Sequence, residues 1–319
     1  MKPPKLTEKQ KERLRILEPK LKLAISERDY NTAKSLVVDL QSLLRPTGHI
    51  TRLLQSKNRF YELALELNEL YTATTGFEGI RKAASENTRI HLESTALLAI
   101  CHLRKEDIEK AKPLIQEVLT NDKVIKSERT RTKFRNEIIE RFNQETTLFS
   151  LKDKKTEYFT DDELENKIMS LMLNNRSEDD LYLSLGKTVP QHTKHLLFQV
   201  HQYSIKQLPS AERLALPSPE DKIKDKEVGK TVFQSVKRVI YNSLCDPKSE
   251  IYKAWFTNGA AAMVLSKGYI RTAVVSSLAN IGISIKMIIA YVVTLIVKFG
   301  LEIYCEHYKP SDLMELRGK

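Results

Sequence analysis

Residues 97–119 read LLAICHLRKEDIEKAKPLIQEVL, and this stretch decides the fold class. Its apolar residues recur every three or four positions, which is the spacing of one face of an α-helix. The same periodicity covers 88–104 and 106–120 and most other parts of the chain, whereas β-strand alternation is hard to find. Glycine and proline number only 10 and 11 in 319 residues. The sequence therefore predicts an all-α protein.

The stretch 97–119 resembles a tetratricopeptide (TPR) unit, a pair of helices of about 34 residues. The resemblance rests on residues at the packing positions of the two helices: Leu98, Ala99, His102, Ile108, Ala111, Ile115 and Val118. An earlier stretch at 25–40 is similar through Tyr30, Ala33, Val37 and Leu40. A degenerate unit between them is placed on Leu67, Tyr71, Phe77 and Ile80. In this alignment Ile80 is the counterpart of Ala33 and Ala111, at spacings of 47 and 31 residues.

The TPR resemblance covers roughly residues 15–120 and implies a helical-hairpin solenoid. Such a solenoid binds another protein or a peptide in its concave face. We expect the partner groove to include Leu67, Tyr71, Leu98 and His102. An irregular helical bundle with the same periodicity is the alternative.

Helix and linker signals divide the chain into four segments. A TPR-like scaffold over 1–150 is followed by a helical middle segment at 151–207. The segment 208–224 contains three prolines and is predicted to be a linker. A C-terminal helical module with a long apolar helix is expected at 225–319.

The composition of the chain indicates which kinds of partner and which cellular compartment to expect. The net charge is +11, which favours an anionic membrane, nucleic acid or an acidic protein surface. The three cysteines are sparse and follow no ligand spacing, which predicts no disulfide framework and a reducing environment: Cys101, Cys245 and Cys305. The first 20 residues lack the apolar core of a secretion signal. We therefore expect a cytoplasmic protein or one at the cytoplasmic face of a membrane.

Residues 251–301 contain no Asp or Glu, in a chain that carries 41 of them. Inside lies the apolar tract Thr272–Val297, with Lys286 as its one charge. As one helix it would rise about 39 Å, enough to cross a hydrocarbon core of roughly 30 Å. On such a helix the small and polar residues trace one stripe: Ala273, Ser277, Asn280, Ser284, Met287, Tyr291, Thr294 and Lys298.

Three arrangements of the tract are open. It could be a membrane helix whose stripe packs against another helix, because small and hydroxyl residues suit close contact in lipid. It could instead be two shorter helices that break near Gly282 in a soluble core, with Lys286 reaching the surface by its long stem. A third arrangement shields the tract and releases it to a membrane on a signal.

The sequence contains no complete motif for catalysis or for binding a nucleotide. Gly186-Lys187-Thr188 and Gly229-Lys230-Thr231 are similar to the end of a phosphate loop, but neither has the required preceding glycine. A solvated helix face or a phosphate-contacting patch is expected for Lys126, Arg129 and Lys133. We predict no catalytic residue, no cofactor and no metal site.

These patterns favour a protein-binding helical scaffold whose acid-free C-terminal segment associates with a membrane, as an anchored adaptor or a regulated effector. The alternative is a fully soluble adaptor or assembly subunit in which 272–297 is buried core or an interface between subunits of a homo-oligomer. A third reading, less favoured, is an accessory protein that binds nucleic acid.

Overall fold

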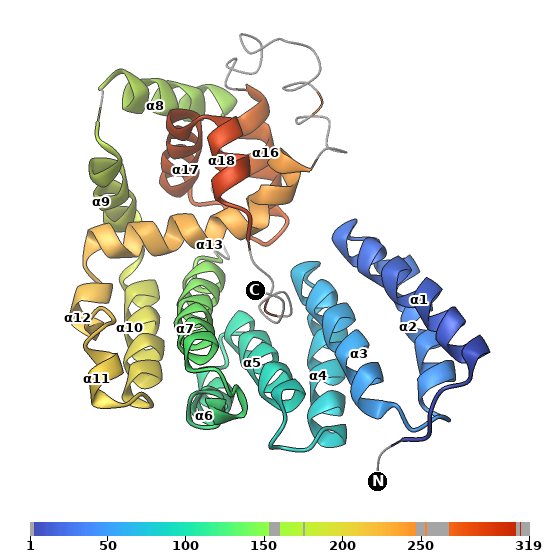
Figure 1. The fold of residues 1–319 in the computed structure, drawn as a ribbon. Coiled ribbons are helices and arrows are strands. Elements are labelled where there is room, and N and C mark those ends of the chain that lie inside the picture. The colour runs from blue at the N-terminus through green and yellow to red at the C-terminus, as the bar shows by residue number, and fades with distance from the viewer. Residues whose placement is uncertain are drawn as a thin grey trace. The chain divides into compact units, whose positions relative to one another are not determined.

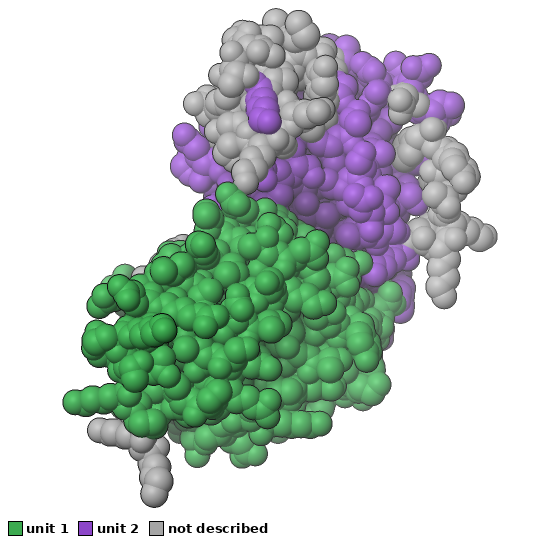
Figure 2. Space-filling model, turned by 90° about the vertical axis from the view of Figure 1, so that its right-hand side faces the viewer, with its two compact units in different colours: residues 1–138, 312–319 green, residues 139–311 purple. Residues whose placement is uncertain are grey.

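The computed structural model describes residues 3–152, 160–174, 176–246, 253, 268–310 and 313. Every regular element in these ranges is a helix, so the all-α prediction is confirmed. The chain forms two compact units, which Figure 2 colours separately. Unit 1 comprises residues 1–138 and 312–319, and unit 2 comprises residues 139–311.

Unit 1 begins with six helices that pack against one another in chain order, as Figure 1 shows. They form three hairpins: α1 (Glu8–Ser26) with α2 (Tyr30–Leu44), α3 (Ile50–Glu66) with α4 (Leu70–Ala83), and α5 (Arg89–Arg104) with α6 (Ile108–Thr120). The short 3-10 helix η1 (Asp122–Val124) and the first part of α7 (Glu128–Ser150) follow. Short connections between contacting helices are typical of antiparallel helical pairs.

The three hairpins share one turn. In each, the middle residue of a three-residue connection has a left-handed backbone: Arg28 (φ 57°), Asn68 (φ 63°) and Glu106 (φ 57°). The next residue donates its backbone N–H to the carbonyl five positions back: Asp29 to Ala24, Glu69 to Ala64 and Asp107 to His102. This six-to-one bond is the signature of a Schellman turn. The hairpins are therefore structural repeats.

The turn fixes the register of the repeats. Five positions after each left-handed residue lies an alanine with 0% exposure: Ala33, Ala73 and Ala111. The alignment that matched Ile80 to Ala33 and Ala111 is therefore wrong, since Ile80 takes the place of Leu40 and Val118. The error spans seven residues, from 73 to 80. Seven residues are about two helical turns, which return to the same face, so periodicity alone could not separate the two registers.

The shared turn predicts a stabilising substitution. Glu106 is exposed and left-handed, and this conformation costs a non-glycine residue roughly 1–2 kcal/mol. Glu106→Gly removes this cost, but glycine loses more backbone entropy on folding. The net effect should be a rise of about 0.5–1 kcal/mol in the free energy of unfolding, measured by urea denaturation. Glu109→Gly, at an exposed position inside α6, should lower it by about 1 kcal/mol. Equal effects at the two positions would contradict the turn.

Unit 2 takes in the second part of α7 and the remaining helices. These are α8 (Asp161–Leu173), α9 (Glu178–Thr188), α10 (Gln191–Lys206), α11 (Ser210–Arg213), α12 (Pro219–Lys222), α13 (Asp225–Cys245), α16 (Gly268–Ala279), α17 (Lys286–Phe299) and α18 (Leu301–His307). The predicted linker 208–224 contains the two short helices α11 and α12. One hydrophobic core joins side chains from α7, α8, α9, α10, α13, α16, α17 and α18.

The apolar tract is two helices rather than one. Helix α16 ends at Ala279 and α17 begins at Lys286, with Gly282 between them at φ 80°. The prediction of a long apolar helix is therefore wrong. Among the described residues, none of the helices combines the length and apolar character that a bilayer crossing needs. Glycine permits this left-handed backbone without a steric penalty, which explains why the tract breaks there.

Burial of α17 shows how the tract is accommodated. All nine residues from Ile288 to Ile296 are buried in the unit 2 core. A helix that is apolar all round belongs in a core or a membrane, and here it lies in a core. The ammonium of Lys286 reaches Glu163 of α8 at 3.5 Å, with a third of the Lys286 side chain exposed. The arrangement of two short helices with Lys286 near the surface is the one the structure adopts.

The break separates the residues of the predicted stripe. Ala273 and Ser277 are buried on α16, and Tyr291 and Thr294 are buried on α17. Asn280 is exposed and Ser284 half-buried, and both lie between the two helices. The ammonium of Lys298 contacts the carbonyl oxygen of Arg176. The stripe is therefore not one continuous helix face.

Ser277 offers a direct test of this packing. Its side chain is 6% exposed, and its Oγ lies 2.7 Å from Oγ of Ser243 on α13. Ser277→Leu should lower the free energy of unfolding by about 1–3 kcal/mol, because the larger side chain overpacks the α13–α16 contact. The neighbouring Ser276 is exposed, so Ser276→Leu should stay within about 0.5 kcal/mol of the original protein in the same urea titration. Two indistinguishable variants would refute the buried α16.

The cysteines differ from the sequence-based expectation. Cys245, at the end of α13, forms a disulfide with Cys305 of α18, while Cys101 is buried and takes no part in a disulfide. The prediction of no disulfide is wrong for this pair. The two residues are 60 positions apart, so no short spacing in the sequence could indicate that folding brings them together.

Candidate functional site

The first helices of the three hairpins form one side of unit 1. Helix α3 contacts α1 on one flank and α5 on the other. Stacked helical repeats bind partners along extended surfaces that successive repeats build together. This side of unit 1 is therefore the first place to look for polar groups that packing alone does not explain.

Helix α3 carries two such groups one turn apart. Asn58 has 0% exposure, and its Nδ2 lies 3.5 Å from the carbonyl oxygen of Ile90 on α5. Its Oδ1 is buried and has no hydrogen-bond partner among the described residues. Glu62 is 5% exposed, and its Oε1 accepts the backbone N–H of Leu313 at 2.6 Å. The α5-facing side of α3 thus presents a buried amide and a buried carboxylate.

Arginines fix the end of α3 from both neighbouring hairpins. Arg28 of the first hairpin donates to the carbonyl oxygen of Glu66 at 3.0 Å. Arg104 of the third hairpin is 6% exposed, donates to the carbonyl oxygen of Leu65 and lies 3.5 Å from the Glu66 carboxylate. These contacts satisfy carbonyls that a helix end leaves without intrahelical partners. They hold α3 rigidly, which suits a recognition surface.

A second polar cluster joins α4, α5 and α6. Glu117 accepts from Arg81 at 2.7 Å, lies 2.7 Å from Nε2 of His91, and is 3.4 Å from Thr95 Oγ1. Arg81 Nε also donates to Thr95 at 2.9 Å. His91 and Thr95 are buried, so a substrate has no access to them. We interpret this cluster as the polar connection between the second and third hairpins.

The predicted groove residues do not form one surface. Leu98 is 3% exposed and belongs to the interior of α5, whereas Tyr71 is 83% exposed at the start of α4. Leu67 follows the end of α3 and is half-buried. His102 is half-buried near the end of α5, where burial lowers its pKa. Sequence reasoning missed Asn58 and Glu62, although polar residues at helical spacing inside an apolar pattern were a usable signal.

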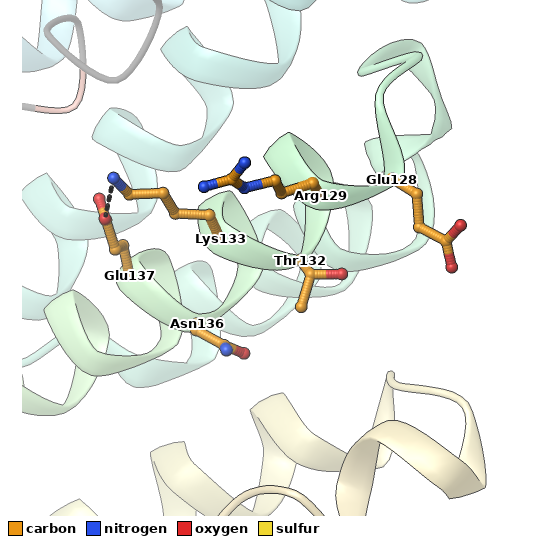
Figure 3. A pocket seen from close by; sticks show the side chains of 6 residues that line it. All are labelled: Glu128, Arg129, Thr132, Lys133, Asn136 and Glu137. Carbon is orange, nitrogen blue, oxygen red and sulfur yellow. Dashed lines mark ion pairs between the residues drawn. The ribbon is translucent and has the colours of Figure 1, made fainter. Parts of the chain in front are cut away.

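The predicted basic patch lines a shallow hollow on α7. Arg129 and Lys133 extend in the same direction from the helix, and Glu137 pairs with Lys133 at 3.6 Å (Figure 3). The hollow, of about 740 Å³, is lined by one face of α7: Glu128, Arg129, Thr132, Lys133, Asn136 and Glu137. Lys126 is exposed and lies outside the lining. The two acids balance the two bases, so the hollow does not attract phosphate strongly.

Gly186 and Gly229, the glycines of the two near-matches to a phosphate loop, serve helix packing. An added Cβ at Gly186 would lie 1.7 Å from the carbonyl oxygen of Asp225, and one at Gly229 would lie 1.9 Å from that of Tyr182. Both residues sit inside helices, α9 and α13, which pack closely together. They therefore allow the two backbones to approach and form no phosphate-binding loop.

His201 is a buried histidine with a defined set of contacts. Its Nδ1 lies 3.0 Å from Nδ2 of Asn143, and its Nε2 lies 2.9 Å from the carbonyl oxygen of Pro217. A neutral ring with its proton on Nε2 satisfies both partners. Burial lowers the pKa of His201, and the nearby Lys222 ammonium lowers it further, while the Pro217 carbonyl and Glu140 oppose them. His201 is therefore held neutral in unit 2.

This burial predicts a pH-dependent stability. Because the folded pKa of His201 lies below its unfolded value near 6.5, the unfolded chain binds the proton more tightly. The stabilisation is complete above about pH 6.5 and is lost as the pH falls toward the folded pKa. Urea titrations at pH 7.5 and 5.5 should show this loss, and His201→Gln should reduce the difference between them. His192→Gln, at an exposed position on the same helix, should leave the difference unchanged.

Comparison with protein families, with curated proteins and with solved structures found no match to this chain. Within the described ranges, no group of three or more His, Cys, Asp or Glu side chains could hold a metal ion. The α5-facing side of α3 is therefore the candidate site, on the strength of its geometry.

Proposed function

We propose that this chain is a protein-binding helical scaffold whose TPR-like hairpins hold a segment of another protein. The observation that carries the proposal is the buried Glu62 carboxylate, which accepts a backbone N–H from a segment outside the hairpins. Backbone recognition of this kind suits a peptide segment, because each residue other than proline offers a backbone N–H.

We assign the C-terminal tract a structural role in this proposal. The burial of Ile288–Ile296 supports the alternative in which 272–297 is core. Membrane association remains a prediction that requires α16 and α17 to leave that core. Vesicle flotation of the folded protein tests it, and co-flotation with anionic vesicles would favour the membrane-acting effector instead. The balanced charges around Arg129 and Lys133 give no support to nucleic-acid binding.

Site-specific photo-crosslinking tests the scaffold function. A photoreactive residue replaces Gln55, which is half-buried and lies one turn before Asn58 on α3. The matched control replaces Val38, which is 58% exposed on α2, a second helix of a hairpin. In the cells that make the protein, we expect a discrete adduct from position 55 that Glu62→Gln weakens. Identical adducts from positions 55 and 38, or none from either, would refute the proposal.

A further inference from the structure

Helix α1 carries an exposed apolar strip on the side that faces away from its core. The buried residues of the helix pack with α2 and α3 in unit 1 (Figure 1): Leu14, Leu17, Leu21 and Ala24. Ile16 and Leu23 are 53% and 57% exposed. They are seven residues apart, so two helical turns bring them to the same face. Pro19 lies between them and is also exposed, which makes the strip continuous.

Cations flank this apolar strip on both sides. The helical period of 3.6 residues places three exposed cations on each flank. One flank carries Lys9, Arg13 and Lys20, and the other carries Lys11, Arg15 and Lys22. The strip and its flanks together form the outward face of α1.

The acids of α1 do not neutralise these cations. Glu8 pairs with Lys11 at 2.6 Å, and Glu18 pairs with Arg52 of α3 at 2.5 Å. Glu12 is exposed near the first end of the strip. Six cations and three acids leave the helix with a net charge of +3. Within the described residues, the five flanking cations other than Lys11 form no ion pair with an acid.

We propose that the outward face of α1 is a docking surface for an anionic membrane. Ile16, Pro19 and Leu23 enter the boundary between lipid headgroups and acyl chains, while the cations on both flanks contact anionic headgroups. The buried face of α1 stays packed against α2 and α3, so docking requires neither unfolding nor release of α16 and α17. The inference goes beyond the scaffold function, because it places the scaffold at a lipid surface.

The order of cations, apolar strip and cations favours lipid over other anionic partners. A nucleic acid offers phosphates to the cations but no apolar environment for Ile16 and Leu23. A bilayer surface offers both. A helix that lies in its plane buries apolar side chains, and the long stems of lysine and arginine reach the headgroups on either side. An acidic protein surface is a different outcome, which the variants below distinguish.

Co-sedimentation of the full chain with vesicles tests the proposal. One set of vesicles contains about 30% phosphatidylserine in phosphatidylcholine, and the other is pure phosphatidylcholine. We expect at least about tenfold tighter binding to the anionic vesicles. Raising the salt concentration from about 0.1 to 0.5 M should weaken this binding, because salt screens exposed charges.

A double variant, Ile16→Gln with Leu23→Gln, tests the apolar strip without changing the charge. It should weaken binding to the anionic vesicles about tenfold, because both side chains lose the gain from leaving water. The matched control is Val38→Gln, since Val38 is 58% exposed on α2 and lies outside the strip. The control should change binding by less than about twofold.

A second double variant, Lys20→Gln with Lys22→Gln, removes one cation from each flank. It should weaken binding about tenfold or more, because each cation near an anionic surface contributes about fivefold. The control, Lys82→Gln with Lys123→Gln, removes two exposed cations of unit 1 outside α1 and should weaken binding clearly less. Thermal unfolding checks that each variant is folded.

The variants of α1 are needed because vesicle binding alone does not distinguish this helix from the tract 272–297. Unchanged binding of both α1 double variants, or no binding of the original chain to the anionic vesicles, would overturn the inference. Binding that depends on Lys20 and Lys22 but not on Ile16 and Leu23 would also overturn it, because it would indicate an acidic partner without apolar contact. The photo-crosslinker at position 55 lies on α3, so the scaffold function and the membrane surface can fail separately.

Discussion

Gly186→Ala should destabilise unit 2 by about 3 kcal/mol or more. The added Cβ would lie 1.7 Å from the carbonyl oxygen of Asp225, a backbone atom that cannot rotate away as a flexible side chain does. The α9–α13 pair must therefore separate, and overpacking of this kind typically costs 1–3 kcal/mol or more. The gain of about 1 kcal/mol that alanine brings to a helix interior offsets only part of this loss. Urea denaturation gives the free energy directly.

Gly229→Ala should behave similarly, because its Cβ would meet the carbonyl oxygen of Tyr182 at 1.9 Å from the other side of the same crossing. The matched control is Gly79→Ala. Gly79 is also inside a helix, α4, but an added Cβ there has nothing within 4 Å. It should raise the free energy of unfolding by about 0.5–1 kcal/mol. A Gly186→Ala variant as stable as Gly79→Ala would show that α9 and α13 do not pack this closely.

Cys305→Ser should lower the free energy of unfolding by about 3–4 kcal/mol in oxidising buffer. The disulfide with Cys245 closes a loop over a sequence separation of 60, and a crosslink of this length removes a large part of the entropy of the unfolded chain. In reducing buffer the original protein loses the same stabilisation, so the two should become nearly equal. Urea titrations with and without dithiothreitol measure both values.

Further cysteine variants test whether the stabilisation comes from the Cys245–Cys305 bond. Cys245→Ser should match Cys305→Ser, and the double variant should add little, because all three remove the same bond. Cys101 takes no part in the disulfide, so Cys101→Ser should keep the full difference between oxidising and reducing buffer. If dithiothreitol leaves the original protein unchanged, the Cys245–Cys305 bond does not stabilise the fold.

Local patterns were enough to predict the helices but not their mutual register. The 3.6-residue period identified the hairpin at 97–119, because it depends only on neighbours along the chain. In the middle hairpin the sequence alignment takes Ile80 as the counterpart of Ala33 and Ala111, whereas the structure puts Ala73 there. The two positions are seven residues apart, and two helical turns present the same face. A signal that resolves the register is an acid four residues before a buried alanine, as in Asp29, Glu69 and Asp107.

The partner of Glu62 was beyond prediction from sequence for a different reason. The Glu62–Leu313 contact links residues 251 positions apart through a single hydrogen bond, and one bond leaves no periodic trace. The same holds for Cys245 and Cys305. The break at Gly282 was one of the arrangements that the sequence allowed. The structure adopts the broken arrangement, with α17 buried among the unit 2 helices. Burial depends on the whole fold, so the sequence pattern alone could not choose between the arrangements.

The disulfide limits how the apolar tract could ever meet a bilayer. Residues 272–297 lie within the covalent ring that Cys245 and Cys305 close, and the Cα atoms of these cysteines are 5.4 Å apart. A single crossing would place the two ends of the tract on opposite sides of a hydrocarbon layer roughly 30 Å thick. While the ring is closed, the tract can enter lipid either as a re-entrant hairpin with both ends on one side or together with a second crossing by another part of the same ring. A single-pass topology would first require a reductant.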